Sequence, residues 1–431
     1  MVAGPGDGRG RHILILVQNL PVPFDRRVWQ EATALRDLGY QVHVVSPRAT
    51  EYRQRRELLQ GIRIYRYRPG PEARRPLAYL LEYVIAIAAH LRLALAIRLR
   101  HRIAAVHVCN PPDLLFVAAL PLMLLGSRLI YDHHDACPEL MMAKGLPARS
   151  WQVRLTRTLE RLTYRLCDVS IETNESYRAI ALTRGRMRPE NVFVVRSAPA
   201  DSRFARAVPD DRWRYGRRYL VAYVGVMGRQ DGLDYLLDAA RAMVHNWRRA
   251  DVQFVLVGGG PELARLRARV QLLDLSEHVI FCGRLPDHEL GEILATADVC
   301  VNPDEVNPMN DISTMNKIME YMALGKPIVQ FDVREGRVSA GAASLYARPN
   351  DPVSLAACIA GLLDNATARE RMGTFGRLRL EGSLSWERQV PQLRAAYDHA
   401  TRGRRPGSAP SHRAVGTSQV TARSPAHRQG R

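Results

Sequence analysis

Short apolar runs alternate with helical patterns along most of the chain, and this alternation restricts the fold more than any other feature of the sequence. At the start, the apolar run 11–17 precedes a helical pattern at 26–38 and a second apolar run at 41–45. Strands that alternate with helices form parallel sheets covered by helices on both faces. The sequence therefore predicts an α/β protein built from doubly wound sheets.

The alternation continues through the first half of the chain and then restarts. Further strands are expected at 62–67, 104–108, 129–132, 168–172 and 192–196, with helices at 77–100, 114–125 and 151–166 and from Asn174. In the second half, strands are expected at 219–225, 252–257, 279–282, 299–303 and 327–331, with helices at 233–245, 261–273, 287–297, 314–324, 352–365, 367–378 and 386–399. Open parallel sheets bind ligands beyond the carboxyl ends of their strands, so we expect functional residues in the loops that follow the strands.

Two domains are expected, because 431 residues exceed the roughly 250 to 300 residues at which one hydrophobic core stops growing. Segment 198–218 is rich in Pro, Asp and Arg and has little periodicity, which is typical of a linker. The predicted organisation is a disordered start at 1–10, a first domain at 11–200, a second domain at 201–384, a last helix at 385–401 and a disordered basic tail at 402–431.

The formal net charge of +19 suggests a nucleic acid or a membrane as partner. Part of this charge lies after Thr401, where the chain has seven Arg and no acidic residue. All but three of the 62 basic residues are Arg, which a genomic bias explains as well as phosphate binding does. The basic residues are dispersed and form no recognition helix, so no nucleic-acid partner is expected. The positive charge of the folded part of the chain favours anionic partners such as nucleotide diphosphates, lipid phosphates or an acidic membrane leaflet.

The cysteines and the apolar stretches indicate the compartment. Six cysteines are scattered without a C-x-x-C pair, which predicts neither a zinc site nor a disulfide framework and fits a reducing cytoplasm. The start of the chain is Gly-rich and polar where a signal peptide needs an apolar core. The longest uncharged stretch, 114–127, is shorter than the roughly 20 residues of a membrane-spanning helix. We therefore expect a cytoplasmic protein without a membrane span.

Segment 298–331 is the most informative part of the chain. An apolar strand ends at Pro303, and a polar loop then leads into a helix. The backbone N–H groups and the dipole of a helix start attract anions, and Ser313 or Thr314 is expected to cap this helix. A diphosphate suits such a site, and the alternative is an ordinary loop with a solvated helix start.

Here the sequence resembles the family 4 glycosyltransferases, which are retaining enzymes of the GT-B superfamily. Their motif E-A-M-A-x-G-x-P-V-V is matched by Glu320-Tyr-Met-Ala-Leu-Gly-Lys-Pro-Ile-Val. The resemblance covers residues 11 to 400, and Ser385 to Glu387 and Tyr397 match a pattern in which the last helix crosses back to the first domain. It implies two Rossmann-like domains that face a cleft, the first on the acceptor side and the second binding a nucleotide sugar.

The resemblance also implies roles for residues around this motif. The family's glutamate binds the nucleotide ribose, which gives this role to Glu320. A second glutamate normally stands eight residues upstream and approaches the transferred sugar, but Ile312 breaks this E-x7-E pair. Asp311 is expected in the sugar-facing place, and Lys317 at the leaving diphosphate. The other implied donor contacts are Asn310, Ser313, Thr314 and Asn316.

A Gly-rich loop at 223–232 is the second candidate for the donor site, because glycines such as Gly228 permit close backbone approach to a phosphate. Where relatives carry an arginine and a lysine, this chain has Val226 and Asp231, so Arg229 is the cation left for the diphosphate. A capped turn with a surface arginine is the alternative. Two further loops resemble the base-side and ribose-side contacts of the family, although tight turns would explain them too; their candidates are Gly259, Arg284 and Leu285.

In the first half, the sequence YDHHD at 131–135 follows a strand. Adjacent residues of one loop do not converge easily on one ion, so no metal is expected here. A histidine beside an acid suits proton handling. The pair His134-Asp135 resembles the H-D or H-E pair that lies beside the sugar or acceptor in the family, and it is the expected catalytic region. His133 is a candidate for a buried packing residue.

The resemblance implies front-face displacement that retains the anomeric configuration of the donor. In this route Arg229, Lys317 and helix-start amides stabilise the leaving diphosphate, whose oxygen takes up the acceptor proton. No D-x-D pair is present, so metal-independent transfer is expected, with no cofactor. The expected co-substrate is a UDP- or GDP-sugar that carries a hexose or an N-acetylhexosamine.

Two features bear on the acceptor. Apolar residues recur at helical spacing in 77–102, and arginines gather toward the end of this segment. The pattern fits a lipid-facing helix and core packing equally well. The apolar residues are Leu77, Leu80, Leu81, Val84, Ala88, Leu91 and Leu95, and the arginines are Arg92, Arg98, Arg100 and Arg102. A lipid-facing helix would imply peripheral contact with the inner face of the cell membrane and a lipid-linked, glycolipid or polysaccharide acceptor. Arg26 and Arg27 either supply charge to the acceptor or only solvate a helix start.

Two other functions stay open at this point. A sugar-nucleotide epimerase would share the two domains and the diphosphate site but would need no acceptor. A non-catalytic protein that binds membranes or polyanions would explain the broken E-x7-E pair and the basic tail. A Rossmann dehydrogenase is disfavoured, because no G-x-G-x-x-G follows the first strand.

Overall fold

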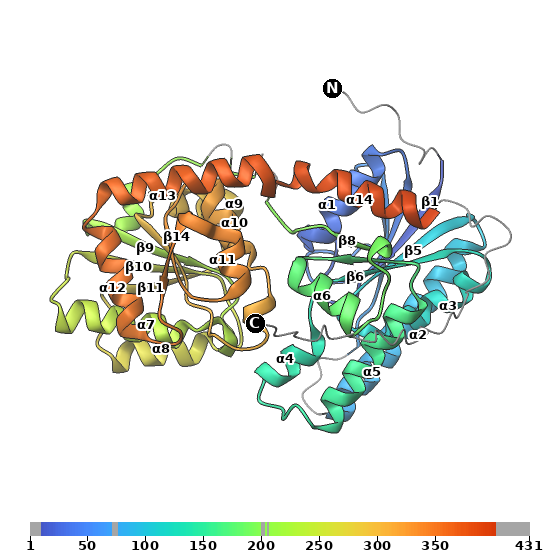
Figure 1. Ribbon diagram of the computed structural model, residues 1–431, viewed down its shortest axis with the longest axis horizontal. Coiled ribbons are helices and arrows are strands. Elements are labelled where there is room, and N and C mark those ends of the chain that lie inside the picture. The colour runs from blue at the N-terminus through green and yellow to red at the C-terminus, as the bar shows by residue number, and fades with distance from the viewer. Residues whose placement is uncertain (1–9, 71–75, 200–202, 205–206, 402–431) are drawn as a thin grey trace, which may run out of the picture. The chain divides into compact units, whose positions relative to one another are not determined.

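The computed structural model describes residues 10–70, 76–199, 203–204 and 207–401 (Figure 1). The described residues up to Thr401 belong to one compact unit, which contains an eight-stranded and a six-stranded sheet. The predicted α/β class with two doubly wound sheets is confirmed. Apart from Gly10, the segments 1–10 and 402–431, which we expected to be disordered, lie outside the described residues.

The first sheet has the strand order β3-β4-β2-β1-β5-β6-β7-β8. Its strands are β1 (His12–Leu16), β2 (Gln41–Pro47), β3 (Arg56–Leu59), β4 (Ile62–Tyr67), β5 (Ile103–Cys109), β6 (Arg128–His133), β7 (Val169–Glu172) and β8 (Val192–Val194). All neighbours pair in parallel except β3, which pairs antiparallel with β4. Strand β3 was not predicted, because charged residues fill half of it, as is common at the edge of a sheet.

Helices cover both faces of this sheet: α1 (Arg26–Asp37), α2 (Pro76–Arg98), α3 (Phe116–Leu124), α4 (Cys137–Ala143), α5 (Trp151–Leu166) and α6 (Glu175–Thr183). Successive residues of a strand point to opposite faces. Ile13 and Ile15 of β1 accordingly share a core with α1, whereas Leu14 and Leu16 share a core with α2 and α3. Helix α4 was not predicted, because its seven residues are too few to show a helical period.

The second sheet has the order β11-β10-β9-β12-β13-β14. Its strands are β9 (Tyr219–Val224), β10 (Val252–Val257), β11 (Val279–Gly283), β12 (Val299–Asn302), β13 (Ile328–Phe331) and β14 (Ser344–Ala347), all paired in parallel. Numbered within the sheet, this is the order 3-2-1-4-5-6 of a dinucleotide-binding Rossmann sheet. The strand order reverses between β9 and β12, which is the point where such sheets bind their ligands.

The helices of the second half are α7 (Leu233–Arg241), α8 (Leu263–Leu272), α9 (Asp287–Thr296), α10 (Asn316–Ala323), α11 (Arg334–Ala340), α12 (Pro352–Leu363) and α13 (Ala366–Arg379). Residues of α7, α8 and α12 pack in one core and residues of α9 and α10 in another. The helix expected at 233–245 is α-helical only to Arg241 and continues as a π-helical turn. The short helix α11 and strand β14 were not predicted.

The last helix, α14 (Trp386–Thr401), packs against the first sheet rather than the second. Trp386, Leu393 and Tyr397 lie in the same core as Ile13 and Leu35. The chain thus returns to the first sheet after completing the second, as the resemblance implied.

Candidate functional site

Two loops meet where the strand order of the second sheet reverses. The loop 225–232 follows β9, and the loop 303–315 follows β12. A Cβ atom on Gly232 would lie 1.8 Å from the carbonyl oxygen of Pro303, and the φ angle of Gly232 is 64°. Only glycine fits this approach. Because ligands of open α/β sheets bind at this point, the two loops form the candidate donor site.

Asn310 fixes the two loops to each other. Its side-chain amide donates hydrogen bonds to the carbonyl oxygens of Gln230 at 2.9 Å and of Glu305 at 2.7 Å. The backbone N–H of Glu305 also donates to the carbonyl of Gln230 at 3.2 Å. Asn310, which was predicted to contact the donor, is buried and holds the two loops of the site together.

Lys317 lies at the base of the candidate donor site. Its Nζ donates to Asp304 Oδ1 at 2.7 Å and lies 3.8 Å from Asp231 Oδ1. Burial alone would lower the pKa of Lys317, but Asp304 and Asp231 outweigh burial and raise it. A Cβ atom on Gly225 would lie 3.3 Å from the Lys317 side chain, so the cation reaches the Gly-rich loop.

The Gly-rich loop holds one partly buried acid and one exposed base. The backbone N–H of Gly228 donates to Asp231 Oδ2 at 3.0 Å. Burial raises the pKa of Asp231 to about 6, although Lys317 opposes the rise. Arg229 begins a 3₁₀ turn and is exposed, so its guanidinium is accessible from solvent.

The remaining candidates lie in the loops that follow the neighbouring strands β10 and β11. The carbonyl of Gly259 accepts a hydrogen bond from the backbone N–H of Met227 at 3.1 Å. Arg284 is exposed, and its guanidinium carbon lies 5.9 Å from the centroid of the Phe24 ring. Leu285 is half-buried against the core of the second sheet.

Asp311, predicted to face the sugar, is engaged elsewhere in this structure. Its Oδ1 accepts a hydrogen bond from the backbone N–H of Arg334 at 2.9 Å, and its Oδ2 lies 3.2 Å from the Arg334 guanidinium. The carboxylate therefore holds the first residue of α11.

Helix α10 begins without a side-chain cap. Met315 is its N-cap residue, while the Ser313 hydroxyl donates to a carbonyl of the preceding turn at 2.7 Å. The Thr314 hydroxyl accepts from the Asn174 amide at 2.9 Å. The predicted capping by Ser313 or Thr314 is wrong, because both hydroxyls have other partners. Asn316 is exposed at the first position of α10.

Glu320, predicted to bind the ribose, is paired with two arginines. Its carboxylate contacts the Arg203 guanidinium and lies 3.7 Å from Arg26 Nη1. Both arginines also contact Asp287, Arg26 at 2.8 Å and Arg203 at 3.2 Å. Arg26 thus joins α1 to α9 and α10 by ion pairs, a contact that the sequence did not indicate.

His134 follows β6 and contacts a buried carboxylate. Its Nε2 contacts the carboxylate of Asp132, which is fully buried. The backbone N–H groups of His134 and Asp135 both donate to Asn110 Oδ1, at 2.7 and 3.1 Å. Burial raises the pKa of Asp135. The imidazole is 16% exposed, so it reaches solvent from a fixed position.

A buried ionic network extends behind His134. Arg27 donates to Asp132 through Nη2 at 2.8 Å and Nε at 3.2 Å, and contacts Glu31 at 3.1 Å. Burial would raise the pKa of Asp132, but Arg27 holds it well below its usual range, whereas burial raises that of Glu31 well above it. Asp132 is therefore charged at pH 7.

The network reaches the last helix through His107. Its Nε2 lies 3.3 Å from Asp132 Oδ2, and its Nδ1 lies 2.7 Å from the Tyr397 hydroxyl. Burial lowers the pKa of His107, so the ring is neutral; it is hydrogen-bonded to Tyr397 and lies against Asp132. The helix α14 is thus connected to the candidate catalytic loop.

His133 points into a second buried network. Its Nδ1 lies 2.9 Å from Glu172 Oε2 and 2.8 Å from the Tyr164 hydroxyl. Burial would lower the pKa of His133, but Glu172 and Glu160 raise it to about 9. The ring is buried as expected, but it is a buried cation rather than a neutral packing group.

Several residues of the site were not identified from the sequence. Asp132 belongs to the YDHHD segment but was not singled out, although its place at the end of a strand was visible. Four further partners were not singled out from the sequence: Arg203, Glu31, His107 and Asp304.

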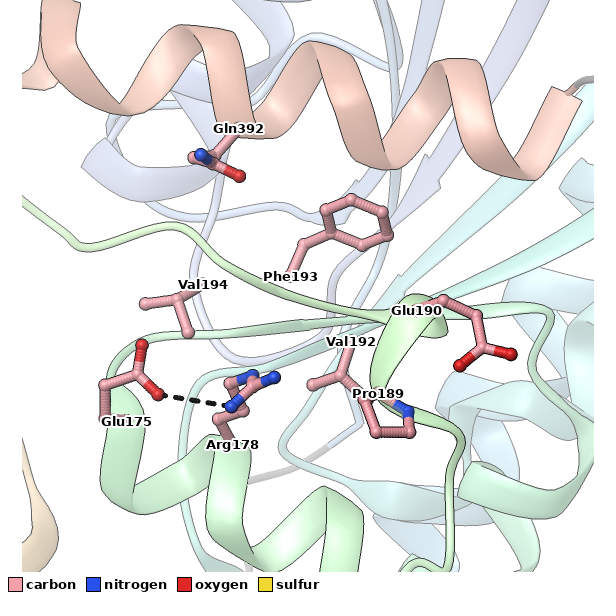
Figure 2. A pocket seen from close by; sticks show the side chains of 8 residues that line it. All are labelled: Glu175, Arg178, Pro189, Glu190, Val192, Phe193, Val194 and Gln392. Carbon is pink, nitrogen blue, oxygen red and sulfur yellow. Dashed lines mark ion pairs between the residues drawn. The ribbon is translucent and has the colours of Figure 1, made fainter.

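A pocket lies beside β8, the edge strand of the first sheet (Figure 2). Its lining includes Glu175 and Arg178 of α6, which form an ion pair of 3.6 Å, and Gln392 of α14. No residue predicted for the site lines this pocket.

Three groups of side chains in the described part of the chain bring potential metal ligands within 4.8 Å of one another. Two of them contain Asp132: His107 with Cys109, and Glu31 with His134. The Arg27 guanidinium already supplies the positive charge at Asp132. Neither group therefore fits a cation without displacing Arg27.

Part of the apolar stripe of α2 faces outward. The side chains of Leu77 and Leu80 lie outside the described residues, and Leu91 packs against the core of the first sheet. Ala86, His90, Ala94 and Ile97 are buried against the sheet. Exposed apolar side chains lie at Leu81, Val84, Ala88 and Leu95 in α2 and at Leu99 just after it, beside exposed Arg92, Arg100 and Arg102. Of the two alternatives left by the sequence, core packing does not account for these residues. No helix within the described ranges has the length and apolar character needed to cross a membrane.

Family models match both halves of the chain. Residues 25–198 match the glycosyl transferase 4-like domain, and residues 218–365 match the glycosyl transferases group 1 model. Among curated proteins, the alpha-D-kanosaminyltransferase of Streptomyces kanamyceticus is 26% identical over 40% of this chain and 44% of its own length. The chain spans about half the length of most curated relatives that it matches.

Solved structures share the fold over most of the chain. The sucrose-phosphate synthase of Thermosynechococcus elongatus has a TM-score of 0.73 at 19% identity, over 90% of this chain and 98% of that one. The HepE protein of Anabaena, solved in complex with UDP-glucose, has a TM-score of 0.68 at 18% identity, over 89% and 98%. The chain belongs to the glycosyltransferases of the GT-B fold, with a glycosyl transferase 4-like domain followed by a group 1 domain.

Proposed function

We propose that this protein is a retaining glycosyltransferase that moves a hexose or N-acetylhexosamine from a UDP- or GDP-sugar to a lipid-linked, glycolipid or polysaccharide acceptor, without a metal ion. The observation that carries the proposal is the meeting of the Gly-rich loop, Lys317 and helix α10 at the reversal point of the second sheet. Glycine backbone, a buried cation and a helix start together suit a diphosphate.

The diphosphate would lie over the Gly-rich loop, with Lys317 below it and the exposed Arg229 beside it. The ribose hydroxyls would bind Glu320, whose carboxylate must first release Arg203.

Front-face displacement needs few protein groups. The bond between the anomeric carbon and the diphosphate oxygen breaks, the acceptor oxygen attacks from the same face, and the leaving diphosphate takes the acceptor proton. Arg229, Lys317 and the free N–H groups at the start of α10 stabilise the charge that develops on the leaving group. His134, held by Asp132, would orient the sugar or acceptor hydroxyl from the first domain.

Peripheral membrane binding follows from the exposed face of α2. Apolar side chains flanked by arginines suit the interface of an anionic membrane. We expect vesicles that contain anionic lipid to sediment the protein, and Val84→Glu to weaken this binding because it places a charge in the apolar stripe. Leu272→Glu, at an 86% exposed leucine of α8, is the matched control. Equal loss in both variants, or none in Val84→Glu, would contradict the membrane role of α2.

The enzymatic proposal is tested with a panel of UDP-, GDP- and ADP-sugars, membrane lipid extract and EDTA. We expect nucleotide release and sugar incorporation into lipid from one donor, both lost in Glu320→Ala and strongly reduced in Arg229→Ala. Isomerisation of the donor without an acceptor would support the epimerase instead. Binding to anionic vesicles with no donor binding or turnover would support a non-catalytic protein on this fold.

A further inference from the structure

Three histidines meet at the amino-terminal edge of the first sheet. His12 is the first residue of β1, His43 lies in β2 and His101 precedes β5. His12 Nδ1 lies 3.0 Å from His43 Nε2. The His101 ring centroid lies 4.4 Å from that of His12 and 4.9 Å from that of His43. Since β2 and β5 are the two neighbours of β1, the sheet itself brings these side chains together.

We propose that His12, His43 and His101 form a binding site for a divalent transition-metal ion, with Zn²⁺ as the expected occupant. One ring nitrogen from each residue lies within 4.8 Å of the others. Imidazole nitrogens bind Zn²⁺ at about 2.0–2.1 Å, so two ligands of a tetrahedral ion lie about 3.3 Å apart. The separation of 3.0 Å between His12 and His43 requires only a small outward rotation of the rings.

Two of the three rings lie in surroundings that disfavour protonation. Burial, the neighbouring histidines and Arg63 lower the pKa of His43 to about 3, and burial together with His101 and Arg63 lowers that of His12. Both rings are therefore neutral at pH 7, which is the form that binds metal ions. The Tyr65 hydroxyl lies 3.4 Å from His43 Nδ1, on the side away from His12, where it can accept the N–H that orients a ligating imidazole.

The surroundings set the expected strength of binding. His12 and His101 are partly exposed, so an ion can enter from solvent and keep a water in the fourth position. The charge of Arg63 disfavours the binding of a cation, although Arg63 Nη1 donates a hydrogen bond to Gln41 Oε1 at 2.9 Å. The three ligands carry no negative charge, so we expect micromolar rather than nanomolar affinity, because ligand charge does not offset that of the ion.

This site lies at the opposite end of the strands from His134, which follows the carboxyl end of β6. A metal here would link β1, β2 and the turn before β5 and would stabilise the first domain. It would take no part in sugar transfer, and the inference does not depend on the proposed function.

The test is equilibrium dialysis of the full chain against Zn²⁺, with bound metal measured by mass spectrometry. His101→Ala removes a partly exposed ligand in a turn, and His12→Gln is a second variant with a similar side-chain volume. His288→Ala, at an exposed histidine of α9, is the matched control for adventitious surface binding. Circular dichroism checks that each variant is folded.

We expect the wild type and His288→Ala to bind about one Zn²⁺ per chain more than His101→Ala, and His12→Gln to bind at least about tenfold more weakly. Zn²⁺ should raise the melting temperature of the wild type but not of His101→Ala. Co²⁺ in the site should give the visible absorption of a four-coordinate ion. Equal stoichiometry and affinity in the wild type and His101→Ala, or half-saturation only above about 1 mM, would overturn the proposal.

Discussion

The carboxylate of Asp132 contacts Nε2 of His134 and at the same time accepts two hydrogen bonds from Arg27. Burial would raise the pKa of Asp132, but Arg27, His134 and His107 together lower it and keep the carboxylate ionised. A fixed anion beside one ring nitrogen determines which nitrogen carries the proton and which way the ring faces. Asp132 is therefore a positioning residue for the candidate catalytic histidine.

Asp132→Asn should lower kcat by about 10²- to 10⁴-fold, because the amide keeps the shape of the side chain but removes the charge that orients the histidine. The KM for the donor should change little, since the donor is expected on the second sheet. Steady-state kinetics over a range of pH would also show a displaced profile. Asp37→Asn, at an exposed aspartate of α1, serves as the control. A loss confined to KM, or a profile identical to the wild type, would argue against this role.

Lys317 supports stability as well as the proposed binding of diphosphate. Lys317→Ala leaves Asp304 buried and unpaired, which should lower the free energy of unfolding by about 3–5 kcal/mol. The double change Lys317→Met with Asp304→Asn removes both charges and should recover most of this stability, but not turnover. Denaturant titration and donor turnover separate the two effects. Equal stability of Lys317→Ala and the wild type would show that the pair is not buried as described.

His133 should make stability depend on pH. The folded state raises its pKa from 6.5 to about 9, so the stabilisation is complete below pH 6.5 and is lost as the pH rises to 9. A shift of this size corresponds to at most about 3.4 kcal/mol. Denaturant titrations at pH 6.5, 8 and 9.5 should show a decline in the wild type that His133→Gln reduces. A stability that is flat over this interval would contradict the buried imidazolium.

Arg203 should weaken donor binding in the free protein, because it occupies the carboxylate of Glu320. Its side chain is partly exposed, so the pair contributes about 1 kcal/mol at most, which corresponds to about fivefold in affinity. Arg203→Ala should bind nucleotide diphosphate up to about fivefold more tightly in calorimetric titrations. Weaker binding would instead mean that Arg203 itself contacts the diphosphate.

Local pattern was sufficient for most of the fold. Helices 26–38 and 151–166 and strands 62–67 and 252–257 were predicted within a residue of their ends, because apolar periodicity and polar caps act over a few neighbours. Strand β3 was not predicted, because an edge strand tolerates charged residues and so lacks an apolar pattern. Helix α11 was not predicted, because it is short and contains Gly336, and glycine has a low helix propensity.

The candidate site was only partly predictable, because the pairing of its charged side chains depends on the folded geometry. His134, Lys317 and Glu320 could be named from strand-end loops and from the resemblance. Their partners Asp132, Asp304 and Arg203 depend on side-chain geometry that no local spacing encodes. The capping prediction for Ser313 and Thr314 failed for the same reason, since Asn174 and the preceding turn engage those hydroxyls.

The most direct test of the central claim is to determine the anomeric configuration of the transferred sugar. The protein is incubated with the donor that turns over, a lipid-linked acceptor and EDTA, and the product is followed by NMR from the start of the reaction. The account predicts a new glycosidic bond with the same anomeric configuration as the donor, formed at an undiminished rate in EDTA and absent with Glu320→Ala. An inverted product, or transfer that stops in EDTA and resumes with added metal, would contradict it.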